Sequence, residues 1–204
     1  MDNFISYCLS QDIIKFGTFT LKSGRTSPYF FNSGAFYQGK TLSRLIDEYA
    51  KLILRENLSF DIFFGPAYKG ISLASGLALH FAERYSKNYS FCYDRKEIKN
   101  HGEGGKFVGA PLAGNLLIID DVVTAGTTLQ EHIQTLIKKS EINIVGIIIA
   151  FDRMERLEIS ETHSIPIYSI TDANQLLKTL QNSSNLSYLE QAKTLEAHLA
   201  LYRR

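Results

Sequence analysis

Residues 116–128 read LLIIDDVVTAGTT, and this stretch decides the fold. The apolar run 116–119 is typical of a buried strand in a parallel sheet, and the small residues at 124–128 predict a turn into a helix. Such a turn can close around a phosphate, with backbone amides and threonine hydroxyls as donors. Asp120 and Asp121 would repel a phosphate, so they require sugar hydroxyls or a divalent cation as partners. The segment predicts a phosphoribosyl ligand; alternatively, the two acids merely cap the next helix.

Apolar runs and amphipathic segments alternate on both sides of this stretch. Strands are expected at 60–64, 89–93, 116–120, 144–151 and 167–170, and helices at 42–54, 70–81, 129–138 and 173–180. This order predicts an α/β fold with a parallel, doubly wound sheet flanked by helices. Ligands of such sheets bind beyond the carboxyl ends of the strands.

The two ends of the chain are less diagnostic. Residues 3–15 show helical spacing and precede a hairpin, while the last helix has a possible capping box formed by Ser187 and Glu190. We expect one domain over 1–204, with N-terminal elements over about 1–35, an α/β core over about 40–175 and C-terminal helices to 204.

Composition excludes several classes of protein. The 204 residues are 45% hydrophobic and carry a net charge of +1, which provides no global field for nucleic acid or an acidic membrane. Cys8 and Cys92 form no paired motif, so we expect neither a disulfide nor a thiolate metal site. No apolar run approaches the roughly 18 residues that span a bilayer. We expect a cytoplasmic protein whose partners are small molecules.

Charged residues follow three of the expected strands. Lys69 lies beside Gly70 at a helix start, Arg95 and Lys96 follow the next strand, and the two aspartates follow the third. These strand ends should meet at one crevice, where Lys69 would bind an anion; the alternative is a solvated lysine.

The polar segment 95–110 contains cations and glycines but few apolar residues. A loop of this length inside a compact domain is more often a functional lid, and its cations suit a pyrophosphate group. An ordinary solvent loop is the alternative. Its GEGGK run at 102–106 lacks the phosphate-loop spacing, so we reject a nucleoside triphosphatase.

Several motifs together resemble the orotate phosphoribosyltransferases, members of the type I phosphoribosyltransferase family. The likeness spans residues 17–156 and lies in LKSGR at 21–25, YFFN at 29–32, GPAYKG at 65–70, RKE at 95–97, HGEG at 101–104, the 116–128 stretch and FDR at 151–153. The resemblance implies a small hood built from the N-terminal helix and hairpin. It also implies Mg²⁺-dependent transfer of ribose 5-phosphate from 5-phospho-α-D-ribose 1-diphosphate (PRPP) to orotate, giving orotidine 5'-monophosphate and pyrophosphate in pyrimidine biosynthesis.

The resemblance also implies residue roles. Catalysis falls to Lys99, Asp120 and Asp121. PRPP binding falls to Lys22, Tyr68, Lys69, Arg95, Lys96, Lys99, His101, Asp120, Asp121, Val122, Val123, Thr124, Ala125, Gly126, Thr127 and Thr128. Orotate binding falls to Phe30, Phe31, Thr124 and Arg153. The Mg²⁺ ion would be carried mainly by PRPP, with Asp120 and Asp121 reaching it through water at most. A homodimer is implied, in which Lys96, Lys99 and His101 reach the neighbouring site.

Two other functions remain open at this stage. The 116–128 stretch accounts only for binding of the phosphoribosyl group, so the acceptor could be a purine. Arg153 and the adjacent aromatics Phe30 and Phe31 argue against a purine. The adjacent aromatics could equally be core residues. The second alternative is a regulator that binds PRPP without catalysis, which the cations Lys99 and His101 argue against.

Overall fold

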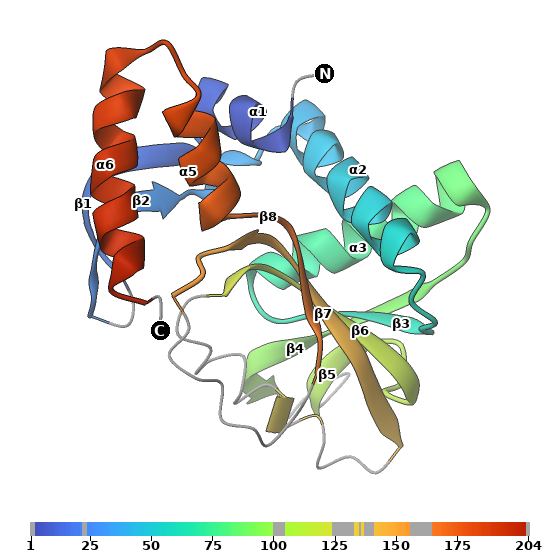
Figure 1. Cartoon of the computed structure of the whole chain (residues 1–204). Coiled ribbons are helices and arrows are strands. Elements are labelled where there is room, and N and C mark those ends of the chain that lie inside the picture. The colour runs from blue at the N-terminus through green and yellow to red at the C-terminus, as the bar shows by residue number, and fades with distance from the viewer. Residues whose placement is uncertain are drawn as a thin grey trace.

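The computed structural model describes residues 3–21, 24–99, 105–123, 133–134, 136, 141–155 and 165–202, with residues 97–99 and 105 described by backbone alone. Its centre is a six-stranded sheet of order β5-β4-β3-β6-β7-β8 (Figure 1). The strands are β3 (Ile62–Gly65), β4 (Ser90–Lys99), β5 (Gly105–Gly109), β6 (Gly114–Val123), β7 (Ile142–Asp152) and β8 (Ile167–Asp172). Every neighbouring pair is parallel except β4 and β5.

The centre of the sheet is β6, which contains the apolar run of the 116–128 stretch. Residues 116–119 are all fully buried. Because side chains alternate along a strand, Leu117 and Ile119 join one core while Leu116 and Ile118 join the other. A strand buried on both faces needs a continuous apolar run, and this confirms the prediction of a parallel strand.

Helices cover both faces of the sheet. On one face lie α2 (Gly39–Glu56) and α3 (Lys69–Tyr85), whose buried residues pack with Leu117 and Ile119. The other face packs against Ile133 and Leu136, which are helical and belong to the helix expected at 129–138. The α/β fold with flanking helices is therefore confirmed.

The N- and C-terminal elements pack together at one end of the molecule (Figure 1). They are α1 (Phe4–Ser10), β1 (Ile14–Thr20), β2 (Thr26–Phe31), the 3-10 turn η1 (Ser33–Ala35), α5 (Ala173–Gln181) and α6 (Leu186–Ala200). The first helix is shorter than the spacing over 3–15 suggests, because Ile14 pairs with Phe31 in the β1–β2 hairpin.

The capping box expected for α6 is wrong. The residue that caps this helix is Asn185, whose side chain accepts a hydrogen bond from the Ser187 backbone amide (2.9 Å). Ser187 already lies inside the helix, and its hydroxyl accepts a hydrogen bond from Gln191 (3.3 Å). Asparagine is as good a cap as serine, and it stands two residues earlier.

The expected loop over 95–110 is largely a hairpin. Strand β4 continues to Lys99, and β5 returns antiparallel to it, with Asp94 opposite Phe107 and Lys99 opposite Gly105. The ring of Phe107 lies against Phe64 of the sheet (6.2 Å between centroids), which anchors the returning strand. Phe107, Ala110 and Leu112 pack against the core and hold this segment at the edge of the sheet.

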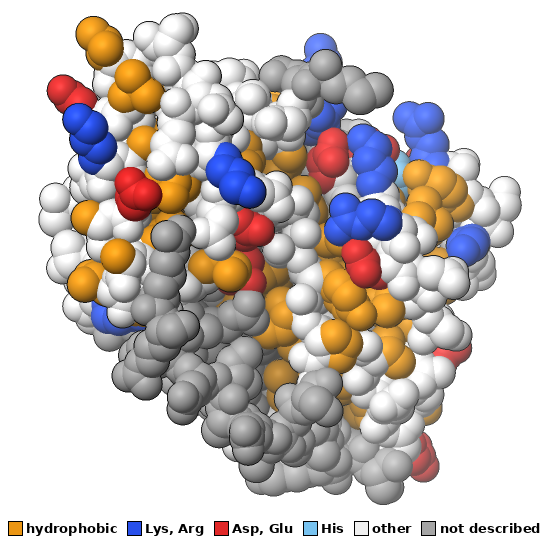
Figure 2. Space-filling view, in the orientation of Figure 1, with side chains coloured by type: hydrophobic (Ala, Val, Ile, Leu, Met, Phe, Trp, Pro, Cys, Tyr) orange, Lys and Arg blue, Asp and Glu red, His pale blue; other side chains and the backbone are white. Residues whose placement is uncertain are grey.

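Both cysteines are free and buried, one in each core. Burial raises the pKa of the Cys8 thiol and raises that of Cys92 to about 12, so neither is a thiolate at neutral pH. Within the described residues, no helix is long and apolar enough to cross a membrane. On the face drawn in Figure 2, lysine and arginine side chains lie among aspartate and glutamate side chains.

Candidate active site

The carboxyl end of β6 presents Asp120 and Asp121 at the edge of the sheet. The Asp121 amide donates to the Asp120 carboxylate (2.9 Å), and the Val122 amide donates to the Asp121 carboxylate (2.9 Å). The hydroxyl of Tyr49, from α2, donates to the Asp120 carbonyl (2.6 Å). Burial, followed by the charges of Asp121 and Asp120, raises the pKa of Tyr49, so this tyrosine stays a neutral donor. These bonds hold the two carboxylates in place without neutralising them.

The cation opposite these acids is Lys69. Its Nζ atom lies 2.6 Å from the Asp121 Oδ2 atom and 2.6 Å from the Ser33 Oγ atom, and the Ser33 hydroxyl also donates to Asp121. About half of the lysine side chain is exposed, whereas only 13% of the aspartate side chain is. Two of the three predicted strand ends therefore meet, and their charges are paired. An arriving anion could draw the ammonium group away from Asp121.

Two glycines allow this meeting. A Cβ atom on Gly65 would lie 2.1 Å from the Gly70 carbonyl oxygen, and one on Gly70 would lie 2.8 Å from the Ile119 carbonyl oxygen. The end of β3, the start of α3 and β6 are therefore in direct backbone contact, which only residues without a Cβ permit. This contact places Lys69 beside the aspartates.

The third strand end also reaches the site. The Lys96 Nζ atom lies 4.5 Å from the centroid of the Tyr68 ring, and most of that ring is exposed. The carboxylate of Asp94, which is buried, accepts a hydrogen bond from the Ala67 amide (2.8 Å) and so ties β4 to the turn before α3. Arg95 lies between Asp94 and Lys96 and is partly buried.

The proposed orotate residues are more enclosed than expected. Arg153 is 2% exposed and binds Glu155 through two hydrogen bonds (2.7 and 3.2 Å). Phe31 is buried and stacks on Phe151 (5.1 Å), so its ring is a core residue and its backbone alone could contact a ligand. Phe30 points to the opposite face of β2 and is 37% exposed. Arg153 follows Asp152, which pairs with Val123 two residues beyond Asp121 on β6.

Several predicted residues lie outside the described part of the chain: Lys22, His101, Thr124, Ala125, Gly126, Thr127 and Thr128. The side chain of Lys99 is also outside it. Val122 and Val123 are described; Val123 is buried beneath the site.

Sequence reasoning missed Ser33 and Asp94. A lone serine after YFFN has no distinctive spacing, so nothing pointed to its bonds with Lys69 and Asp121. Asp94 had a weak signal, since it precedes two cations at a strand end. A hollow of about 210 Å³, lined by Ser33, Lys69 and Asp121 among others, lies beside these groups.

Comparison with known proteins agrees with this geometry. Residues 32–176 match the family model described as "Phosphoribosyl transferase domain". The chain is 44% identical to an orotate phosphoribosyltransferase from Pseudomonas syringae pv. tomato, covering 98% of this chain and 96% of that protein. It is 46% identical to the one from Pseudomonas savastanoi pv. phaseolicola, covering 90% of each.

Among solved structures, an orotate phosphoribosyltransferase from Francisella tularensis superimposes with a TM-score of 0.78 at 35% identity, covering 96% of this chain and 98% of that one. An adenine phosphoribosyltransferase from Thermoanaerobacter pseudethanolicus shares the fold at 15% identity, with a TM-score of 0.55 and coverage of 79% of this chain and 96% of the other. The chain therefore belongs to the phosphoribosyltransferase family and, within it, to the orotate phosphoribosyltransferases.

Proposed function

We propose that this chain transfers ribose 5-phosphate from PRPP to orotate, giving orotidine 5'-monophosphate and pyrophosphate in pyrimidine biosynthesis. The observation that carries the proposal is the meeting of Lys69, Ser33 and Asp121 at the carboxyl ends of β3 and β6. A cation beside two carboxylates suits a ligand that has both an anionic group and sugar hydroxyls. The full-length likeness to orotate phosphoribosyltransferases identifies the base.

In the reaction a ring nitrogen of orotate bonds to the anomeric carbon of PRPP as the bond to the pyrophosphate oxygen breaks. Positive charge develops on the ribose and negative charge on the leaving group, so electrostatics and positioning dominate catalysis. Asp120 and Asp121 bind the ribose hydroxyls and keep negative charge near the developing cation. Residues 124–128 cradle the 5'-phosphate.

Cations bind the leaving pyrophosphate. Lys69 leaves Asp121 for the phosphate oxygens, and its half-exposed side chain has the freedom to do so. Lys22, Tyr68, Arg95, Lys96, Lys99 and His101 complete this set, with Lys99 as the residue that stabilises the leaving group. In the single chain the Lys96 ammonium group lies over the Tyr68 ring (4.5 Å to the centroid), and it would leave this ring to serve a neighbouring site.

Orotate binds between the hairpin and the end of β7. Arg153 pairs with its carboxylate, Phe30 and the Phe31 backbone flank its ring, and Thr124 completes the contact. Among described residues, the hydrogen bonds of Arg153 use Nε and Nη2, so we assign the contact with the substrate carboxylate to Nη1.

Mg²⁺ is the cofactor we assign, carried mainly by PRPP. Within the described residues, no group of three or more His, Cys, Asp and Glu side chains could hold a metal ion. Two adjacent carboxylates, one of them already paired with Lys69, fit an ion that reaches the protein through water. When bound, the ion neutralises charge on the pyrophosphate.

We also propose a cytoplasmic homodimer in which Lys96, Lys99 and His101 serve the neighbouring site. Mixing a Lys99→Ala protomer with an Asp121→Asn protomer tests the sharing. Heterodimers should regain activity, because one of their two sites then has both intact groups. Failure of the mixture to exceed either parent refutes sharing.

The test of function is the fall in orotate absorbance when the protein is mixed with orotate, PRPP and Mg²⁺. The loss of orotate absorbance should require Mg²⁺ and stop when a chelator is added. Adenine or hypoxanthine in place of orotate should not react. Lys69→Ala should lower kcat/KM at least about 100-fold. The matched control is Lys51→Ala, which breaks exposed ion pairs with Asp47 and Glu48 on α2 and should leave activity unchanged.

The outcomes separate the alternatives. Turnover of a purine instead of orotate would favour a transferase for another base, whose fold this chain shares. PRPP binding without turnover of any base would favour a regulator.

A further inference from the structure

A buried cluster joins β7, the hairpin and α6 around the carboxylate of Glu155, whose side chain is fully buried. Arg153 donates to it through Nη2 (2.7 Å) and Nε (3.2 Å), and the Tyr29 hydroxyl donates to Oε1 (3.2 Å). The His198 Nε2 atom lies 2.9 Å from the same oxygen, and the Arg25 Nη2 atom lies 3.8 Å from Oε2. We call these five residues the Glu155 cluster.

Hydrogen bonds hold one edge of the planar Arg153 guanidinium group, and an aromatic ring covers one of its faces. Nη2 donates both to Glu155 and to the Ser27 hydroxyl (2.7 Å), while Nε donates to the second carboxylate oxygen. The Tyr29 ring lies 4.2 Å from the central guanidinium carbon. A planar fork held this way has one orientation, and the entropy of ordering it is lost at folding rather than at substrate binding.

A buried ion pair is weak evidence for stability, because apolar residues of similar volume would often do as well. A buried ion pair at this place therefore points to a role other than stability. The cluster directly follows residues 151–152, which pair with Val122 and Val123 at the end of β6.

We propose that Glu155, held in turn by His198, is a positioning residue that orients Arg153 for the carboxylate of the base. The inference rests on the proposed function, since it takes Arg153 to be the orotate contact. It gives α6 a part in substrate recognition beyond packing.

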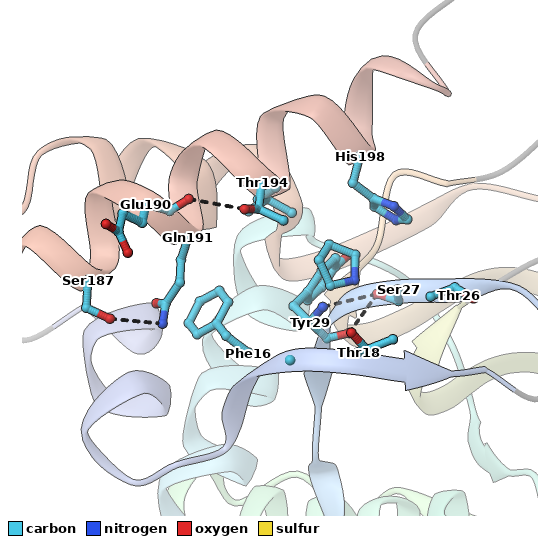
Figure 3. Close-up of a pocket in the computed structure, with 13 residues that line it drawn as sticks. Phe16, Thr18, Thr26, Ser27, Tyr29, Ser187, Glu190, Gln191, Thr194 and His198 are labelled. Atoms are coloured by element: carbon cyan, nitrogen blue, oxygen red, sulfur yellow. Dashed lines mark hydrogen bonds between the residues drawn. The ribbon is translucent and has the colours of Figure 1, made fainter.

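Figure 3 shows how α6 reaches the hairpin. His198 extends from α6 toward Ser27 and Tyr29 of β2, at one end of a cavity of about 620 Å³ between the two elements. Apolar residues of α6, among them Leu195 and Leu199, pack into the core, whereas His198 is the α6 residue whose side chain lies against the Glu155 carboxylate.

The test compares KM values for the two substrates. Glu155→Gln keeps the shape of the side chain but removes its charge, and should raise the orotate KM about tenfold while the PRPP KM changes less than about twofold. His198→Ala should give a smaller rise of the same selectivity, and His198→Gln, which retains a nitrogen donor, should reverse part of it. If Glu155→Gln does not fold, Tyr29→Phe replaces it as the test variant, and its orotate KM should rise about threefold.

Two controls separate positioning from loss of structure. Leu177→Ala loosens the apolar core through a buried residue of α5 rather than of α6, and it should leave the ratio of the two KM values unchanged. In the double variant Arg153→Ala/Glu155→Gln, the orotate KM should equal that of Arg153→Ala alone, because Glu155 acts through the arginine.

Several results would overturn the inference: additive effects in the double variant, equal rises in both KM values, or a selective rise of the orotate KM in Leu177→Ala like that in His198→Ala. An unchanged orotate KM in Arg153→Ala overturns it together with the assignment of Arg153. Absence of orotate turnover in the wild type is a different result, because it refutes the proposed function.

Discussion

Replacing Gly70 by alanine tests the backbone contact that places Lys69 beside the aspartates. The added Cβ would lie 2.8 Å from three atoms: the Gly65 carbonyl carbon, the Ile119 carbonyl oxygen and the Pro66 ring. Each is about 0.6 Å closer than ordinary van der Waals contact, and two are backbone atoms that cannot rotate away. The start of α3 must therefore move off β6.

We expect Gly70→Ala to lower the free energy of unfolding by about 2 kcal/mol, within the usual cost of overpacking. For a chain of this length, that corresponds to a fall in Tm of about 4–8 °C. Because the same displacement carries Lys69 away from Asp121, kcat/KM for PRPP should fall at least about tenfold. Thermal unfolding and initial rates measure the two effects.

The matched control is Gly76→Ala on the same helix. Its Cβ would meet only the Ile46 side chain, at 3.0 and 3.3 Å, and the end of that side chain can move. Overpacking and the helix preference of alanine then offset each other, so Tm should change by less than about 3 °C. Equal effects of the two substitutions, or full activity in Gly70→Ala, would refute the reasoning.

Three further predictions concern other parts of the chain. Lys99→Ala should lower kcat at least about 100-fold with little change in Tm, and near-normal turnover would remove it from the mechanism. Asn185→Ala removes the cap of α6 and should lower the free energy of unfolding in urea by about 1 kcal/mol, whereas Ser187→Ala should lower it by less than about 0.5 kcal/mol. The reverse order would favour Ser187 as the capping residue. Burial raises the pKa of Glu155, but the hydrogen bonds and charges of Arg153 and His198 outweigh burial and place it below its ordinary value of 4.5. The ionised Glu155 carboxylate therefore stabilises the fold fully above pH 4.5, and this stabilisation is lost as the pH falls further. The urea midpoint of the wild type should drop more steeply below pH 4.5 than that of Glu155→Gln. Parallel curves of midpoint against pH would contradict this.

Sequence patterns predicted the layered core well because they depend on burial. The run at 116–119 is apolar on both faces, and such a strand has no place except the middle of a covered sheet. The meeting of the strand ends that carry Lys69 and Asp121 also followed, since parallel strands bring their carboxyl ends to one edge, but the sequence assigned Lys69 to a ligand anion and not to Asp121.

Features that depend on distant partners could not be predicted. In the β4–β5 hairpin, Phe107 packs against Phe64, which lies more than forty residues away in the sequence. Similarly, Arg153 and Glu155 look like ordinary charged residues in sequence, and only the meeting of β7 with the hairpin and α6 shows that both are buried. Local patterns contain no information on these contacts.

One buried thiol lies in each core, so the reactivity of Cys8 and Cys92 toward a thiol reagent reports local unfolding of each core. Cys8 is covered by the packing of α1, and Cys92 lies in the sheet near its β5 edge, so a reagent reaches each only when its own region separates. The two alkylation rates, followed by peptide mass under native conditions, would report two local opening free energies in one experiment. Protection of Cys92 alone by added PRPP would then reveal how far ligand binding stiffens the sheet.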